Sequence, residues 1–278
     1  MKSLTVYSDL LTHTSGLCYD IAEPSVIQWA ATIGRTATNL AWSLDGFSTP
    51  LIFPPGQGWR YGTSIDWVGQ LIEKLSGVSL GTYLQQNIFG PNQMLNTGFW
   101  PAKLKAPAGR AEFAHRNPDT GDLQPGPPPH PDEHEVESGG AGLYSTAGDY
   151  AKFLQALLGG KLLQPETVRL LFQPQLNEKQ RAAMDETVAV MPDMYKPEFP
   201  VSLPVDFSYG GMVNLENVPG KRKKGSVMWS GMMNGHWWVD LETGIAGILM
   251  TTVLPPGDPG VKTLFHELET AVYTGLDG

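Results

Sequence analysis

The stretch FPPGQGWRYGTSIDWVGQLIEKLSG, residues 53–77, decides the fold of this 278-residue chain. Its first part belongs to a proline- and glycine-rich loop at residues 50–58. Its second part predicts a helix, because apolar residues recur at helical spacing at Trp67, Leu71, Ile72 and Leu75. Ser76 and Gly77 predict where this helix ends. Tyr61 therefore lies at the junction of a loop and a helix.

Helical patterns dominate the first part of the chain. Residues 5–17 predict a short helix that ends in a turn, and Ser79 can cap a helix that follows it. Residues 117–139 are rich in proline and acidic residues, which predicts a long surface loop. Two more helices are expected beyond this loop, one capped by Thr146 and one opened by Pro165.

After about residue 205 the apolar period becomes that of strands, which predicts strands at residues 226–230, 235–240 and 245–253. A final helix follows, with an apolar stripe formed by Val261, Leu264, Phe265, Leu268, Ala271 and Val272. Helices, then antiparallel strands, then one more helix are typical of an α+β fold. We expect one domain over residues 1–278, mainly helical in 1–205, with an antiparallel sheet and the last helix in 206–278.

The composition argues against several classes of partner. With 28 acidic and 19 basic residues the formal net charge is −9, which disfavours binding to nucleic acid or to an anionic membrane. The one basic run, residues 221–224, is expected to be a solvated loop. Cys18, the single cysteine, is expected to be a small buried thiol. No secretion signal is recognised, so we expect a cytoplasmic protein.

Five segments occur in the order that one family shows. They are residues 10–17, 53–77, 138–154, 162–172 and 229–251, and the four not yet quoted read LLTHTSGL, SGGAGLYSTAGDYAKFL, LLQPETVRLLF and WSGMMNGHWWVDLETGIAGILMT. Together they resemble the serine β-lactamase-related esterases of the class C type. They resemble still more closely the fungal lovastatin-type transesterases, which transfer acyl groups to polyketides. The resemblance covers nearly the whole chain and implies a serine β-lactamase/transpeptidase-like fold.

The resemblance implies acyl transfer or ester hydrolysis through a covalent acyl-serine, acting on hydrophobic acyl esters or thioesters in secondary metabolism. Tyr61 matches the family tyrosine and would act as a general acid or base. The strand at Trp229 to Gly231 matches one that usually reads Lys-Thr-Gly, and the N–H of Met232 would stabilise the acyl oxyanion. The residues expected to bind substrate are Trp229, Gly231, Asn234, His236 and Trp237. The implied ligand is a small acyl molecule, with no metal or organic cofactor.

The Ser-x-x-Lys motif, which supplies the family's nucleophile and its base, does not occur in residues 1–278. No lysine has a serine three residues before it. In the family, this motif and the first strands of the sheet precede the segment that matches residues 10–17. We therefore expect an incomplete fold with no nucleophile and negligible turnover. We also expect an open sheet edge at residues 245–253, which could pair with another chain.

Three other interpretations stand beside that of an enzyme fragment. The chain can be a pseudoenzyme that binds acyl ligands without catalysis. It can be a different hydrolase, although the one Gly-x-Ser-x-Gly sequence, at residues 77–81, joins two predicted helices instead of following a strand, and His13 is expected to be a hydrogen-bonded turn residue. It can bind a metal, but the suitable residues lie in a proline-rich loop without the spacing of a known site; they are His130, Asp132, Glu133, His134 and Glu135.

Overall fold

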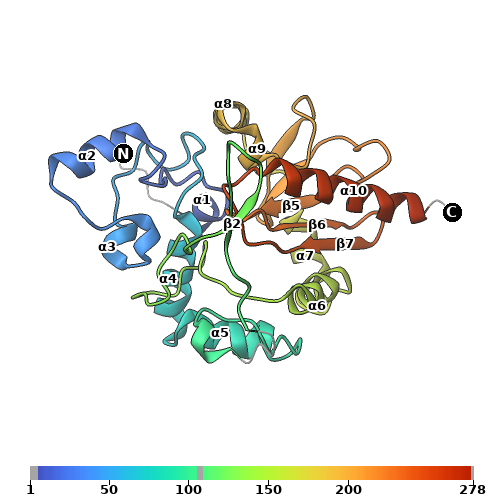
Figure 1. Cartoon of the computed structure of the whole chain (residues 1–278), viewed down its shortest axis with the longest axis horizontal. Helices are drawn as coiled ribbons and strands as arrows, with labels where there is room; N and C mark the ends of the chain where they lie inside the picture. Colours follow the sequence, from blue (N-terminus) through green and yellow to red (C-terminus); the bar gives the residue numbers. More distant parts are fainter. Residues whose placement is uncertain (1–5, 105–108, 277–278) are drawn as a thin grey trace. The chain divides into compact units, whose positions relative to one another are not determined.

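The computed structural model describes residues 6–104 and 109–276 (Figure 1). Contacts within the chain divide it into two units. The first takes in residues 1–105, 128–145 and 176–185, and the second takes in residues 106–127, 146–175 and 186–278. The second unit thus includes segments from both sides of residue 205. Each unit is described by itself below.

The first unit consists of short helices joined by turns. Its helical elements are α1 (Tyr7–Leu11), α2 (Pro24–Thr32), η1 (Asn39–Ala41), α3 (Leu44–Phe47), α4 (Ser64–Ser76), α5 (Leu80–Leu84), the π-helical turn η2 (Gln85–Phe89) and η3 (Pro101–Lys103). Helix α4 ends as predicted, at Gly77 with a φ of 74°. The side chain of Ser79 accepts a hydrogen bond from the N–H of Thr82 and caps α5, also as predicted.

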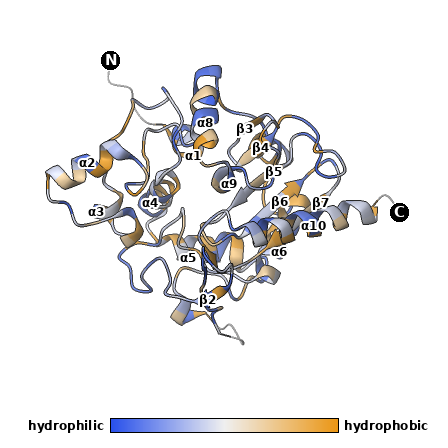
Figure 2. Ribbon diagram, turned by 45° about the horizontal axis from the view of Figure 1, so that its top comes forward, coloured by the Kyte–Doolittle hydropathy of each residue, from blue (hydrophilic) through white to orange (hydrophobic). Residues whose placement is uncertain are grey.

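Helix α8 (Glu178–Val190) belongs in part to each unit. Its sequence carries charged residues in most turns, and Figure 2 shows it coloured mainly as hydrophilic. No helix within residues 6–104 and 109–276 combines the length and the apolar sequence that crossing a lipid bilayer requires.

The second unit contains all the strands within the described residues. Its elements are β1 (Ala114–Arg116), β2 (Leu123–Pro125), α6 (Ala147–Leu158), α7 (Pro165–Leu171), α9 (Pro192–Tyr195), β3 (Val205–Phe207), β4 (Met212–Asn214), β5 (Val227–Ser230), β6 (His236–Asp240), β7 (Ile245–Leu249), β8 (Val253–Leu254) and α10 (Pro259–Leu276). Strands β3 to β7 form an antiparallel sheet in chain order. Helix α6 begins as predicted, with the hydroxyl of Thr146 accepting from the N–H of Asp149.

Helices cover both faces of the five-stranded sheet (Figure 1). On one face, α6 and α7 pack on β4, β5 and β6 through buried apolar side chains: Leu154, Leu157, Val168, Phe172, Val213, Val227 and Val239. On the other face, the ring of Phe265 in α10 lies 4.7 Å from the ring of His236 and 5.4 Å from that of Trp238. The sheet is therefore the central layer of this unit.

The strand predicted over residues 245–253 is wrong in one respect. The chain leaves the five-stranded sheet after Leu249, and Val253 begins β8, which pairs in parallel with β1. Strands β1 and β8 form a second sheet with β2, so the loop predicted over 117–139 contains one short strand. The apolar pattern of the sequence continues through Met250 without a break. The segment nevertheless forms two strands, because Val253 pairs in parallel with β1, which is distant in sequence.

The apolar stripe predicted on the last helix is also partly wrong. Helix α10 buries Val261 and Phe265 as expected, but it also buries Glu269 and Tyr273. Leu264, Leu268 and Val272 are between 44% and 48% exposed. The buried face of α10 is therefore rotated away from the leucines. This rotation depends on charged residues elsewhere in the chain that pair with the helix, and the helix sequence alone does not reveal them.

Those partners come from the basic run 221–224, which is only half solvated. Arg222 is fully buried and Lys221 is 9% exposed, whereas Lys223 and Lys224 are exposed. The carboxylate of Glu269 lies 2.5 Å from Nε of Arg222 and 3.0 Å from Nζ of Lys221. Arg222 also pairs with the buried Glu198. Its guanidinium lies 5.1 Å from the ring centre of Trp238, so the prediction of a solvated loop is wrong for this half.

We expect Glu269→Ala to lower the free energy of unfolding by roughly 3–5 kcal/mol, because it leaves buried cations without one of their counter-charges. Glu267→Ala is the matched control, since Glu267 is exposed on the same helix, and it should change stability by about 0.5 kcal/mol or less. Urea denaturation of the two variants measures the difference. Equal effects would show that the buried charge network does not stabilise α10.

Candidate functional site

A segment that follows α1, His13–Cys18, forms a cradle against which the residues around Tyr61 lie. The carbonyl of His13 accepts from the N–H of Arg60 at 3.0 Å, and the carbonyl of Thr14 accepts from the N–H of Gly56 at 2.9 Å. The proline- and glycine-rich loop therefore runs along the cradle and delivers Tyr61 at a fixed point before α4.

The cradle touches the backbone directly at Gly62. A Cβ atom built on Gly62 would lie 2.3 Å from Cα of Cys18, so no other residue fits here without moving one of the two segments. Two residues after Gly62, the hydroxyl of Ser64 lies 2.8 Å from that of Ser15, and both side chains are fully buried.

Cys18 is 1% exposed, and burial raises the pKa of its thiol to about 12. It is therefore the buried thiol that was predicted.

Aromatic rings flank the ring of Tyr61. The ring centre of His13 lies 4.7 Å away with the planes at 57°, and that of Tyr19 lies 5.4 Å away at 58°. His13 also makes an edge contact with Trp59 at 6.2 Å. His13 is 3% exposed, and desolvation lowers its pKa to about 3, so the imidazole is neutral near pH 7.

Asp66 fastens α4 to the turn at residues 138–142. Its Oδ1 accepts from the hydroxyl of Ser138 at 2.5 Å and from the N–H of Gly140 at 3.1 Å. A Cβ on Gly140 would lie 2.7 Å from Oδ2 of Asp66, so the turn can approach only because this residue is glycine. Sequence reasoning missed this contact. The available signal was an aspartate at a helix position where the neighbouring pattern is apolar.

The residues predicted around the Lys-Thr-Gly-like strand lie in the second unit, whereas Tyr61 lies in the first. Trp229 is on β5 opposite Trp237 on β6, and its ring contacts Phe207 at 5.4 Å. Gly231 and Met232 follow directly in the turn between the two strands, where Gly231 is exposed and Met232 is partly exposed.

Asn234 adopts a left-handed conformation with a φ of 56° and is 2% exposed. Its amide donates to the carbonyls of Val253 and Pro255, at 2.9 and 2.8 Å. Its Oδ1 accepts from the N–H groups of Gly257 and Asp258, at 2.8 and 3.0 Å. The structure thus gives this side chain the role of holding the loop before α10.

His236 and Trp237 point to opposite faces of the sheet. His236 is 1% exposed, with Nδ1 at 2.9 Å from Oε1 of Glu198. Trp237 packs beside the core cluster under α6 and α7. Both side chains therefore contribute to packing on the sheet, and their predicted contact with substrate stays a prediction.

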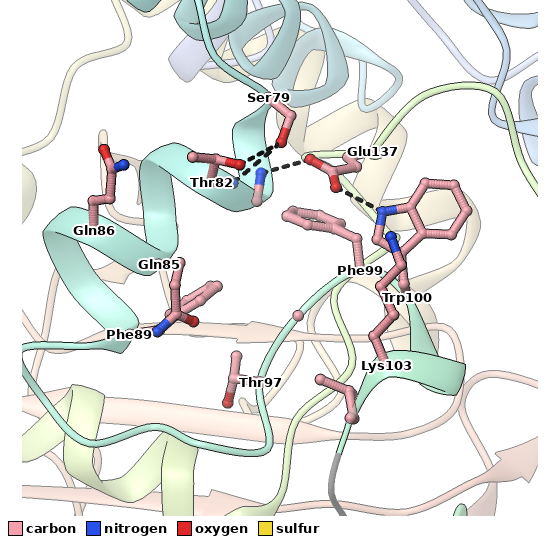
Figure 3. A pocket seen from close by; sticks show the side chains of 13 residues that line it. Ser79, Thr82, Gln85, Gln86, Phe89, Thr97, Phe99, Trp100, Lys103 and Glu137 are labelled. Atoms are coloured by element: carbon pink, nitrogen blue, oxygen red, sulfur yellow. Dashed lines mark hydrogen bonds between the residues drawn. The ribbon is translucent and has the colours of Figure 1, made fainter.

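A pocket of about 370 Å³ opens in the first unit beside α5, η2 and η3 (Figure 3). Aromatic side chains form its inner walls, and hydroxyl and amide groups lie at its rim: Phe89, Phe99, Trp100, Ser79, Thr82, Gln85 and Gln86. Glu137 accepts from Nε1 of Trp100 at 2.7 Å and from the N–H of Gly81 at 2.5 Å. None of the residues predicted to be catalytic or to bind substrate lines this pocket, and Ser79 was predicted only as a helix cap.

The two histidines of the acidic loop are engaged by tryptophans. The ring of His130 stacks on Trp42 at 4.6 Å, and that of His134 stacks on Trp100 at 4.0 Å. Within residues 6–104 and 109–276, no three histidine, cysteine or acidic side chains come close enough together to hold a metal ion.

Asp66 should make stability depend on pH. Burial raises the pKa of its carboxyl from 3.8 to about 6. A raised carboxyl pKa favours the folded state fully below about pH 4, and this contribution is lost as the pH rises through about 6. The shift corresponds to about 3 kcal/mol. We expect Asp66→Asn to remove this part of the pH dependence in urea denaturation between pH 4 and pH 8. Asp119→Asn, at an exposed position, should leave it in place; equal profiles for parent and Asp66→Asn would contradict the expectation.

The sequence profile of the family described as Beta-lactamase matches residues 5–271. Monacolin J acid methylbutanoyltransferase of Aspergillus terreus is 33% identical over 95% of this chain and 66% of its own length. Lovastatin esterase of Penicillium rubens is 30% identical over 88% of this chain and 64% of its own length. The chain thus spans about two thirds of these curated relatives.

Solved structures agree with this assignment. A variant of simvastatin synthase from Aspergillus terreus superposes with a TM-score of 0.89 at 32% identity, over 100% of this chain and 68% of that one. EstCE1, a hydrolase with promiscuous acyltransferase activity, has a TM-score of 0.73 at 21% identity, over 97% of this chain and 72% of that one, and shows the fold alone. The predicted α+β, transpeptidase-like fold is confirmed, and the chain belongs to the beta-lactamase family.

Proposed function

We propose that this chain serves acyl transfer or ester hydrolysis on small molecules that carry hydrophobic acyl esters or thioesters, in secondary metabolism. The observation that carries the proposal is the fixed setting of Tyr61, with rings on its flanks and its neighbours bonded to a buried cradle. A general acid or base needs such a fixed position to act on a proton in the transition state. The names of the relatives, which include acyltransferases and an esterase, support the same chemistry.

In this proposal Tyr61 moves a proton to or from the reacting oxygen. The N–H of Met232 donates to the oxyanion that forms on the acyl carbonyl. Trp229, Gly231, Asn234, His236 and Trp237 form or support the wall that binds the acyl chain. The setting is cytoplasmic, which rests on the sequence alone. No metal or organic cofactor takes part in these steps.

We propose that residues 1–278 do not perform the serine step. A hydroxyl is a weak nucleophile without an adjacent base, and no lysine here follows a serine at the spacing of one helical turn. Residues that act as one catalytic unit fail together, so Tyr61 alone does not restore turnover. The second candidate function is that of an acyl-binding protein without catalysis. It rests on the same lack of a lysine at that spacing after a serine in residues 1–278.

The purified chain should hydrolyse p-nitrophenyl butyrate at the rate of the buffer, and Tyr61→Phe should behave identically. Intact-mass spectrometry should find no acyl adduct. Titration calorimetry with a non-hydrolysable thioether analogue of an acyl thioester should give saturable binding that Trp229→Ala weakens and Leu75→Ala, at an exposed position of α4, does not. A stoichiometric burst with an adduct would overturn the missing serine step, and absence of binding would overturn the acyl site.

We also propose that strand β7 can pair with an added strand. It is the last strand of the five-stranded sheet within the described residues, and its sequence Ile245–Leu249 has no charge and no proline. Such an edge is a template for another strand. Leu264 and Leu268 lie on the flank of α10 opposite His266, whose ring contacts Lys221, and they are 45% and 48% exposed.

Sedimentation velocity should therefore detect association that grows with concentration. Leu268→Lys places a charge on the exposed flank of α10 and should weaken association several-fold. Leu75→Lys, at a 78% exposed position in the first unit, should not. A chain that stays monomeric across the concentration series would contradict the pairing.

A further inference from the structure

The ring of His13 lies closer to the ring of Tyr61 than that of Tyr19 does. The ring centres of His13 and Tyr61 are 4.7 Å apart, against 5.4 Å for Tyr19. The same residue is bonded through its carbonyl to the N–H of Arg60, the residue directly before Tyr61. His13 therefore holds both the ring of Tyr61 and the backbone that leads to it.

We infer that His13 is a positioning residue for Tyr61: its buried ring fixes the direction of the phenol, and it does so without exchanging a proton. The role of Tyr61 in acyl chemistry rests on the proposed function, but the positioning itself is a property of the fold. It gives the histidine of the LLTHTSGL segment a task distinct from the catalytic base that a histidine usually suggests.

The backbone at His13 explains why a histidine suits this place. His13 has a φ of 57°, in the left-handed region, where histidine and asparagine occur more often than bulky or branched residues. This bend turns its carbonyl toward Arg60 and its ring toward Tyr61 and Trp59. Glycine would allow the bend but supplies no ring, and phenylalanine supplies the ring at the cost of backbone strain.

The environment of His13 keeps the ring in one chemical state. It is 3% exposed, and its ring contacts the rings of Trp59 and Tyr61. Desolvation disfavours the imidazolium, and the lowered pKa of His13, about 3, leaves the ring uncharged between pH 5 and pH 8. We therefore expect the contact with Tyr61 to be the same at pH 5 and at pH 8.

Fluorine NMR of the full chain labelled with 3-fluorotyrosine tests the inference without any turnover. The chain has nine tyrosines, and Tyr61→Phe assigns the resonance of Tyr61. His13→Asn keeps the left-handed bend and removes the ring. We expect it to move the Tyr61 resonance toward that of free 3-fluorotyrosine by more than half of its offset, while Tyr83 on α5 stays in place. The same exchange at His115, in the second unit, should move neither.

His13→Phe is the second variant, and it tests the positioning role of the His13 ring if His13→Asn does not fold. It should keep at least half of the Tyr61 offset, because a ring is restored. The parent resonance should show no inflection between pH 5 and pH 8. The inference is overturned if folded His13→Asn leaves Tyr61 unchanged, if all tyrosines move together, if folded His13→Phe releases Tyr61, or if an inflection near pH 6.5 appears. Because no acyl substrate is present, failure here is separate from failure of the proposed chemistry.

Discussion

The first unit depends on one backbone contact, that between Gly62 and Cys18. A Cβ atom on Gly62 would collide with the backbone of Cys18, so two segments 44 residues apart in sequence can lie this close only because residue 62 is glycine. Several features around Tyr61 lie beside this contact. The hydroxyl of Ser64 lies next to that of Ser15 at the start of α4, and the phenol ring contacts the rings of His13 and Tyr19.

A second link makes that arrangement rigid from the opposite side. Asp66 is one turn into α4 and is bonded to the glycine-rich turn at Ser138. A carboxylate in such a place is costly to desolvate, and two hydrogen bonds offset part of the cost. Helix α4 is therefore held at its first turn by the cradle on one side and by the turn on the other, which suits a helix that must present a neighbouring residue reproducibly.

The second unit is stabilised in a different way. Its sheet has an apolar layer under α6 and α7, but the layer under α10 contains a buried guanidinium between two carboxylates and three aromatic rings. Buried ion pairs of this kind add little net stability compared with apolar packing, yet they tolerate few alternative arrangements because each charge must find its partner. They fix the rotation of α10 on the sheet.

The sequence predicts the parts of the fold that local chemistry determines. The end of α4 at Gly77 and the caps at Ser79 and Thr146 depend on residues within one turn of each other. The buried face of α10 and the break after Leu249 depend on partners far away in the chain, so spacing alone did not find them. The role of Tyr61 was predicted from the resemblance to a family. The contact of Asp66, whose partner Ser138 is 72 residues away in sequence, was not predicted.

Asn234 and Gly235 form an Asn-Gly step, the dipeptide in which the following peptide nitrogen most readily attacks the side-chain amide to give a succinimide. Here both ends of that amide are bonded to the loop before α10, and the residue is 2% exposed. The native fold therefore protects a chemically fragile bond, and molecules that open this loop age faster than those that stay closed. The amount of isoaspartate at this position would therefore increase with the frequency at which the loop before α10 opens.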